Sequence, residues 1–416
     1  MTRATDVPLE AHVPLRRNRD FQLYWTGQFL SELGSRVSGI AFPLLVLALT
    51  GSPAKAGVAG FVAGAPFLLL LHAGALLDRL NRKRVMIACE AVRAVALASI
   101  AIAYVLDELT FAHILVVAFV EGVGWVFFDI ASRSAVRHLV PAQQLSTAIA
   151  QNQARDYAAH LLGPALGGFL FGLSRAVPFL FDATTYLISL ITLLFVRPDF
   201  QEQRSGARRH LRREIGEGIS FLWRQPLLRT TSLIGMGSDL VLNTLFLVVI
   251  VIAQKQGASP ALVGAMFIFV GVGGVLGALL APLLTRRVHV RIIVVGTEWA
   301  VTLLISMLLV VEQPIVIGLI LGAMFVGFPA WNAIIGAYRL ALVPDGLQAR
   351  VQSVSTLLAV GSVPLGLLTV GFTLERFGTT ETVLGLLVIM LVVAVSAAAS
   401  RSVREAPALN ELQIRP

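Results

Sequence analysis

Long, continuous apolar runs dominate the sequence, and short polar segments separate them. An α-helix needs about 20 predominantly apolar residues to cross the hydrocarbon core of a bilayer, whereas the strands of a membrane barrel show short segments of alternating hydrophobicity. We therefore predict an all-α membrane protein. Its twelve transmembrane helices are expected at residues 21–49, 56–77, 85–106, 112–131, 145–173, 176–196, 229–253, 260–284, 290–311, 314–337, 350–374 and 380–400.

The composition agrees with this prediction and narrows the chemistry. Of the 416 residues 56% are hydrophobic, and the mean hydropathy is +0.80, which is more apolar material than a soluble core needs. Cys89 is the single cysteine, so the chain forms neither an internal disulfide nor a cysteine-based metal cage, and we predict no metal site. The net charge of +9 comes from short basic tracts between apolar runs. Such tracts indicate cytoplasmic loops of a membrane protein and not nucleic-acid binding.

The distribution of Lys and Arg predicts the orientation of the chain. An even number of spans places both termini on one side of the membrane, and basic residues accumulate in cytoplasmic loops. Most Lys and Arg residues, including the cluster at 79–84, fall in alternate connections on the side of the termini. The connections on the other side hold only Lys55, Arg175, Lys255 and Arg376. Both termini are therefore predicted to be cytoplasmic. The N-terminal apolar run is long enough to span, so no cleavable signal peptide is expected.

The two halves of the chain repeat each other. Three separate segments of the first half align with segments of the second half at a single offset of 203 residues, which is a strong sign of an internal repeat. The aligned pairs are "GALLDRLNRKRV" (74–85) with "GALLAPLLTRRV" (277–288), Gly34-Ser35 with Gly237-Ser238, and "LVP" at 139–141 with "LVP" at 342–344.

A repeat with an even number of spans gives two halves of the same orientation. Such halves are related by an axis along the membrane normal and enclose a cavity, as in transporters. We predict an N-terminal six-helix half at 1–196, a central cytoplasmic linker at 197–228, and a C-terminal six-helix half with its tail at 229–416. A partly amphipathic run in the linker is expected either to lie on the inner membrane surface or to be solvated.

The loop "GALLDRLNRKR" at 74–84 resembles the signature loop of the major facilitator superfamily, Gly-x-Leu-Ala-Asp-Arg-x-Gly-Arg-Lys. In that family, the carboxylate and arginines of this loop latch the cytoplasmic ends of the two halves together. Asn81 stands where the family has a glycine, and asparagine is the next best residue for a left-handed turn. The second copy lacks the charged pair, so only the N-terminal latch is expected to be intact. The resemblance assigns the latch to Gly74, Asp78, Arg79, Arg82 and Lys83.

A second motif resembles an element of proton-coupled drug antiporters within this superfamily. The sequence "GPALGG" in the fifth predicted span matches their Gly-Pro-x-x-Gly-Gly element, at Gly163, Pro164, Gly167 and Gly168. Proline removes a helical hydrogen bond and glycine lets a neighbouring helix approach closely, which makes a bend that can seal one end of a cavity. The alternative is ordinary packing of small residues in a membrane helix.

The resemblance extends over nearly the whole chain. Segments such as "RNRDFQLYWTGQFLSELGSRVSGIAFPLLVLALTGS" and "FDATTYLIS" are similar to the macrolide-efflux and enterobactin-exporter branch of the drug:proton antiporters. This implies a monomeric exporter of small lipophilic or amphiphilic molecules in the bacterial inner membrane. A proton gradient would drive it without a cofactor, and the sequence contains no Gly-x-x-x-x-Gly-Lys-Ser/Thr loop for ATP. The alternatives are export of a siderophore, natural product or lysophospholipid by the same fold and, more distantly, a polytopic membrane enzyme.

Ionisable residues inside predicted spans are the candidates for proton coupling, because a charge at mid-membrane is costly. Glu32 and Arg36 lie four residues apart on one face of the first span, and the repeat aligns Arg36 with Asp239 in the seventh span. We expect Glu32 and Asp239 to compete for Arg36, which would make a proton switch; the alternative is a permanent structural ion pair. Glu121, in the fourth span, is a further candidate.

The remaining polar and aromatic residues in the spans support weaker predictions. Trp125, Asn243 and Asn332 are candidates to line the cavity, although aromatic residues at helical spacing more often belong to a core. Structural roles are expected for the others. We predict pairing of Arg93 with Glu90, a cluster of Asp129, Arg155 and Asp156, an Asp182 side chain near the outer interface, and packing roles for His72 and His160.

Overall fold

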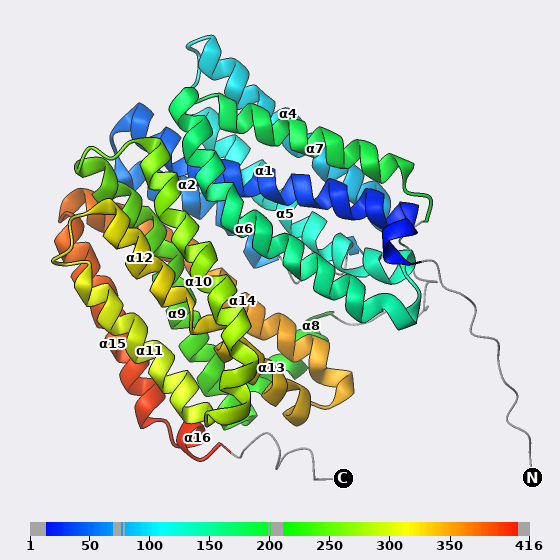
Figure 1. The fold of residues 1–416 in the computed structure, drawn as a ribbon, viewed down its shortest axis with the longest axis vertical. Helices are drawn as coiled ribbons and strands as arrows, with labels where there is room; N and C mark the ends of the chain where they lie inside the picture. The colour runs from blue at the N-terminus through cyan, green and yellow to red at the C-terminus, as the bar shows by residue number, and fades with distance from the viewer. Residues whose placement is uncertain (1–13, 70–75, 78–79, 199, 201–210, 407–416) are drawn as a thin grey trace, which may run out of the picture.

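The protein is a bundle of long helices arranged in two halves (Figure 1). The computed structural model describes residues 14–69, 76–77, 80–198, 200 and 211–406, and no strand occurs in these residues. The helices of the N-terminal half are α1 (Arg19–Thr50), α2 (Pro53–Gly64), α4 (Arg82–Val105), α5 (Phe111–Leu139), α6 (Leu145–Leu173) and α7 (Val177–Phe195). Those of the C-terminal half are α9 (Pro226–Lys255), α10 (Pro260–Arg287), α11 (Val290–Met307), α12 (Pro314–Phe325), α13 (Phe328–Leu342), α14 (Asp345–Arg376) and α15 (Thr379–Ala399).

Helices occupy all twelve predicted spans, and ten candidate spans in the described residues are long and apolar enough to cross a membrane. Two predicted spans are not among the ten. The described part of α2 is short and continues as a 3-10 turn, η2 (Ala65–Leu69), while α6 is polar in its first half. The span predicted at 314–337 is interrupted between α12 and α13, where a proline follows Gly327 closely and cannot donate its backbone hydrogen bond.

Local sequence signals set the helix ends. The side chains of Asn18, Ser52, Thr110 and Ser259 each accept a hydrogen bond from a backbone N–H three residues further on, at the starts of α1, α2, α5 and α10. Gly51 has φ of 64° and ends α1 in the left-handed conformation that glycine adopts without steric cost. These short polar caps place the turns between consecutive spans.

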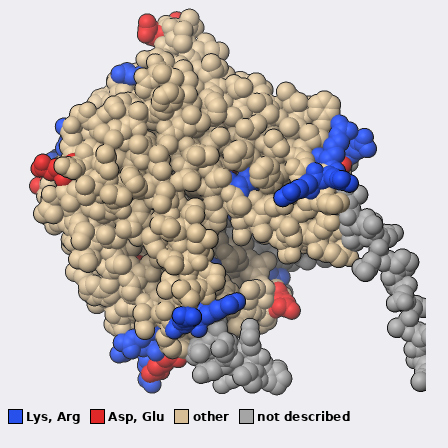
Figure 2. Space-filling model, in the orientation of Figure 1, with Lys and Arg blue, Asp and Glu red and all other residues tan. Residues whose placement is uncertain are grey.

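We call the side of the molecule with the N-terminus of α1 the terminal side, and the side with the connection between α1 and α2 the far side. The two halves meet where α2 packs against α14 and α6 packs against α10. The largest hydrophobic core contains residues of both halves and lies towards the far side, for example Leu44, Phe179, Val248 and Met324. Towards the terminal side each half has its own separate core. The halves are therefore joined at the far side and apart at the terminal side, and Figure 2 shows the surface hollowed between them.

The linker helix α8 (Leu211–Arg224) packs against α14 and α9. Leu222 of α8 is fully buried in a small core with Leu228 and Val351, and Glu217 forms an ion pair with Arg350. The amphipathic run predicted in the linker is thus helical, and at least its end docks on the C-terminal half.

Candidate functional site

The paired charges of α1 point into the recess between the halves. Arg36 Nε donates a hydrogen bond to Glu32 Oε1 at 2.8 Å, so the two residues pair as predicted. Other faces of α1 are covered, because Ser31 bonds to α4, and Gly167 of α6 lies against Val37. The side chains of Arg36 and Glu32 keep 36% and 25% of their surface exposed. This sector of α1 therefore lines the central cavity.

Further charged groups lie beside this pair on α6. His160 and Arg155 both interact electrostatically with Glu32. Arg155 forms an ion pair with its neighbour Asp156 at 2.8 Å. The predicted cluster with Asp129 is wrong in part, because Asp129 pairs with Arg133, one turn along its own helix.

Asp239 of α9 has a different environment from Glu32. Its carboxylate makes no hydrogen bond or ion pair with any described residue, and Arg36 is not among the groups that act on it. Neighbouring positions of α9 contact other helices, since Gly235 lies against Trp331 of α13 and Ser232 bonds to Ser355 of α14. Viewed down the axis of α9, the direction of Asp239 lies between the directions of these two contacts. Asp239 therefore faces the space between α13 and α14. The expected competition of Glu32 and Asp239 for one arginine does not occur in this conformation.

The three predicted cavity-lining residues differ in their surroundings. Asn243 is exposed one turn after Asp239, and its amide donates to the backbone oxygen of Asp239 at 2.8 Å. Asn332 of α13 is also exposed. Trp125 of α5 is half-buried and packs edge-on against Phe67, with ring centroids 5.0 Å apart. The two asparagines thus have free surface for a ligand, whereas Trp125 mainly packs against a neighbouring segment.

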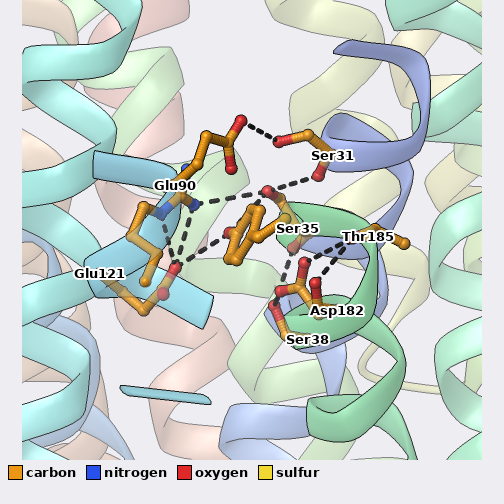
Figure 3. Close-up of polar contacts among 9 residues, drawn as sticks. Ser31, Ser35, Ser38, Glu90, Glu121, Asp182 and Thr185 are labelled. Carbon is orange, nitrogen blue, oxygen red and sulfur yellow. Dashed lines mark hydrogen bonds and ion pairs between the residues drawn. The ribbon is translucent and has the colours of Figure 1, made fainter. Parts of the chain in front are cut away.

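A second group of charges is buried inside the N-terminal half, and we call it the N-half network. It consists of Glu90 and Arg93 of α4, Glu121 of α5, and Asp182 and Tyr186 of α7, with hydroxyl groups contributed by α1 (Figure 3). Arg93 donates to Glu121 Oε2 from Nε at 3.1 Å and from Nη2 at 2.9 Å, and its guanidinium lies 4.2 Å from the centre of the Tyr186 ring. The predicted pairing of Arg93 with Glu90 is therefore wrong.

Hydroxyl groups donate to the other two carboxylates of the N-half network. Glu90 Oε1 accepts hydrogen bonds from Ser31 at 3.0 Å and from Ser189 at 2.7 Å. Asp182 accepts from Ser38 and from Thr185. Both carboxylate side chains are completely buried, so the expectation that Asp182 lies near the outer interface is wrong. The repeated serines of α1, spaced so that they share one face, were the sequence signal for this network.

The predicted latch loop lies largely outside the described residues, including Gly74, Asp78 and Arg79. Of its described members, Arg82 is the first residue of α4 and Lys83 donates from Nζ to the backbone oxygen of Val196. Asn81 has φ of −73° and caps α4 by accepting from the backbone N–H of Arg84 at 3.1 Å. It therefore does not adopt the left-handed conformation that its place in the motif suggests.

The "GPALGG" segment of α6 lies at helix contacts on both of its sides. Gly163 and Gly167 lie against Arg36 and Ile40 of α1, so they allow close packing within the N-terminal half. Gly168 faces the other half, where it meets the backbone of Gly264 in α10. Pro164 is part of the same crossing, because its carbonyl oxygen also faces Gly264. The predicted antiporter motif thus forms one of the two contacts that join the halves at the far side.

The second contact between the halves combines close backbone packing with a polar cap. Gly57 of α2 lies against Gly371 of α14, and Glu375 of α14 accepts hydrogen bonds from Ser52 Oγ and from the backbone N–H of Ala54. These two donors belong to the first turn of α2, where unpaired N–H groups and the helix dipole stabilise an anion. A carboxylate of one half therefore caps a helix of the other half at the far side.

Substituting Glu375 with alanine is expected to favour separation of the halves at the far side. The cap is exposed to solvent, so the equilibrium should shift by no more than about fivefold. The measurement is the distance distribution between spin labels at Arg175 and Ala261, in a Cys89→Ala background. The distribution should gain a longer component. The matched control is Glu381→Gln, because Glu381 is also on the far side but makes no contact with the N-terminal half among the described residues. Equal distributions in both variants would contradict the role of Glu375.

Comparison with known proteins places the chain in a family. The family model MFS_3, described as transmembrane secretion effector, matches residues 10–413. The chain belongs to this family. Its members are transporters of the major facilitator superfamily, so the protein is a membrane transporter and the alternative of a membrane enzyme is wrong.

Relatives with similar sequences cover most of the chain. The "Multidrug efflux pump Tap" of Mycolicibacterium fortuitum is 26% identical over 393 residues, covering 89% of this chain and 93% of that protein. The protein of the same name from Mycobacterium tuberculosis H37Rv is 28% identical over 419 residues, with 93% of each chain covered. "Macrolide efflux protein A" of Streptococcus pyogenes is 25% identical over 218 residues, or 52% of this chain and 54% of that protein. The resemblance to the macrolide-efflux branch is thereby confirmed.

Solved structures of other major facilitator transporters share the fold. A bacterial homologue of the human lysosomal transporter Spinster, in an inward-facing and unoccupied conformation, superimposes with a TM-score of 0.72 at 14% identity. The match covers 93% of this chain and 98% of that one. The nucleoside transporter NupG gives a TM-score of 0.66 at 14% identity, with 94% and 98% covered. The predicted twelve-helix major facilitator architecture is consistent with these matches.

Proposed function

We propose that this protein exports small lipophilic or amphiphilic molecules from bacteria in exchange for protons, by alternating access around the central cavity. The names of its relatives support efflux of drug-like compounds. The joined far side and separated terminal side correspond to one end state of such a cycle. The Lys and Arg residues concentrated on the terminal side support a cytoplasmic location of both termini. The described conformation would then be open to the cytoplasm.

The observation that carries the proposal is the carboxylate of Asp239 in the cavity wall, without a cationic partner among the described residues. A carboxylate without a cationic partner inside the membrane has two ways to be neutralised, by a proton or by a positive charge on a bound molecule. Binding of an amphiphilic cation would therefore displace a proton from Asp239. Mutual exclusion of proton and substrate at one carboxylate is what antiport requires.

Replacing Asp239 with asparagine is expected to weaken export of cationic compounds by about tenfold or more. The reason is the loss of one charged contact, worth about 1.5–3 kcal/mol. The measurement is accumulation of ethidium, erythromycin and a labelled siderophore in efflux-deficient bacteria, with and without a protonophore. Expression of the wild type should lower accumulation of ethidium or erythromycin, and the protonophore should abolish this effect.

Glu312→Gln is the control, because Glu312 is an exposed carboxylate in the connection between α11 and α12. If Asp239→Asn exports as well as this control, Asp239 does not take part in coupling. If the wild type lowers accumulation of the siderophore alone, the cargo is a siderophore. If it changes accumulation of none of the three compounds, the assignment to drug efflux is wrong.

A further inference from the structure

The N-half network contains more acidic than basic groups, and most of it is buried. Three carboxyl groups, of Glu90, Glu121 and Asp182, surround one guanidinium, that of Arg93. Arg93 and Glu121 pair directly, and their side chains keep only 4% and 12% of their surface exposed. Glu90 and Asp182 are completely buried, and their hydrogen-bond partners are neutral hydroxyl groups. Two carboxyl groups are thus buried without a cation of their own.

Unpartnered oxygen atoms occur at the same place. Glu90 Oε2 and Glu121 Oε1 are buried, and neither has a hydrogen-bond partner among the described residues. Burying an ionised carboxylate without compensation costs several kcal/mol, so such a group requires a positive occupant. The smallest occupant that reaches an enclosed oxygen is a proton. Cys89 and Tyr186 are the other titratable groups of α4 and α7 near these carboxyl groups. Among the described residues of α1, the side chains that bond to the network are those of serines and of Gln28, which do not titrate.

Hydroxyl groups link Glu121 to α1, the helix that bears the cavity-facing Arg36. Tyr186 bonds to Glu121 Oε2 at 3.1 Å and to Ser35 at 2.9 Å. Ser35 directly precedes the cavity-facing Arg36, and Glu121 is the most exposed carboxyl group of the network. Figure 3 shows the labelled side chains of Ser35, Glu90, Glu121 and Asp182 extending from several helices into one polar cluster. A proton that enters at Glu121 therefore meets Tyr186 and Ser35, which can accept and donate it, in the same polar cluster as Glu90 and Asp182.

The N-half network also lies beside the contact that joins the two halves. Gly122, the residue after Glu121, lies against the backbone of Ala63 in α2. The next residue of α2, Gly64, lies against Pro364 of α14 in the other half. A change in the pairing of Glu121 with Arg93 would shift α5 against α4 and reach α2 through this direct backbone contact. The carboxyl groups of the network thus lie beside the contact between the two halves.

We propose that the N-half network is a second proton-binding site of the transport cycle, separate from Asp239. Glu90 and Asp182 hold the proton, and Glu121 exchanges it with the central cavity. The proton is taken up when the cavity is open to the far side, is still held in the described conformation, and is released to the terminal side when a substrate binds. This proposal rests on the proton antiport proposed above, although proton binding itself can be tested without any transported compound.

The test is infrared spectroscopy of the purified full-length protein in detergent, through the C=O stretching band of protonated carboxyl groups. The wild type should keep this band in neutral and mildly alkaline buffer, where ordinary Asp and Glu side chains have lost their protons. Glu90→Gln and Asp182→Asn should each weaken the band, and the part that remains when the two are combined comes from other carboxyl groups that hold a proton, such as Asp239. These substitutions keep the size and hydrogen-bonding capacity of the side chains, and a symmetrical size-exclusion peak checks folding. Glu312→Gln is the matched control and should leave the band unchanged.

Two results would overturn the proposal. One is the absence of the band in the wild type, a measurement that depends on no variant. The other is an unchanged band in both Glu90→Gln and Asp182→Asn. Spectra recorded in sodium and in choline buffer complete the test, because a band that sodium removes would show a sodium site in place of a proton site.

Transport measurements separate this proposal from the proposed function. In liposomes, Glu90→Gln and Asp182→Asn should lose ethidium accumulation driven by a proton gradient by tenfold or more, yet retain exchange of labelled for unlabelled ethidium. If folded variants lose both gradient-driven accumulation and exchange of ethidium, Glu90 and Asp182 do more than bind the proton, and the proposal is contradicted. If the wild type transports no compound while the band behaves as expected, the drug-export proposal fails and the proton site stands.

Discussion

Replacement of Arg93 with leucine is expected to lower the free energy of unfolding of the protein by about 3–5 kcal/mol, because it removes one partner of a buried ion pair. The guanidinium makes two hydrogen bonds to Glu121 and stacks over Tyr186. After the substitution, three buried carboxyl groups remain with no guanidinium among them. The measurement is thermal or denaturant unfolding of the detergent-purified protein, followed by tryptophan fluorescence.

A double variant separates the cost of an unpaired charge from the cost of lost packing. Arg93→Leu combined with Glu121→Leu removes both partners, and it should recover a large part of the lost stability, since an apolar pair of similar volume often replaces a buried ion pair at little cost. The isolated Glu121→Leu variant should be destabilised because it leaves Arg93 unpaired. Equal stability of Arg93→Leu and the wild type would contradict the description of the network as a tightly coupled buried cluster.

The separation into spans was predictable because it depends on local composition. Each apolar run is long enough to cross a bilayer, and most described helices begin and end within a few residues of these runs, although α5 continues to Leu139, eight residues beyond its predicted end. The pairing of Glu32 with Arg36 was predictable for the same reason, since four residues along one helix fix the distance. The break between α12 and α13 was missed, although Gly327 and Pro329 mark it in the sequence.

The N-half network was not predictable from spacing, because its members come from four different helices. Spacing along α4 suggested that Arg93 pairs with Glu90, but its guanidinium extends to Glu121 of α5 instead. The approach is possible because Gly124 of α5 leaves room for the aliphatic part of Arg93. Such contacts depend on how helices cross, and the sequence indicated them only through the acidic residues in the spans and the serines that share one face of α1.

The relation between Arg36 and Asp239 shows a different limit on what can be predicted from the sequence. The repeat aligns their positions in α1 and α9, but equivalence within two halves does not make two residues neighbours. In the described conformation the halves are apart at the terminal side, and Arg36 pairs with Glu32 alone among the carboxylates of the described residues. Whether symmetry-related residues meet depends on the state of the transport cycle, which the sequence does not specify.

Substituting Gly168 with valine is expected to prevent the halves from closing at the far side and so to abolish export against a gradient. A Cβ atom at this position would come within 2.7 Å of Gly264 Cα, and the obstacle is backbone that cannot rotate away. Overpacking of this kind costs about 1–3 kcal/mol. That cost would shift the equilibrium between closed and open far sides by about fivefold to more than a hundredfold. A transporter that does not seal this side cannot retain the difference in concentration that its cycle builds.

Gly172→Val provides the matched control for this prediction. Gly172 lies one turn further along α6, where no described atom lies within 4 Å of the added carbon. The same substitution there costs similar helix propensity but does not meet α10, so export should remain near that of the wild type. Spin labels at Arg175 and Ala261 should report a longer separation in Gly168→Val alone. If both variants lose export equally, helix propensity and not the crossing explains the effect; if neither does, the contact of α6 with α10 is not the seal of the far side.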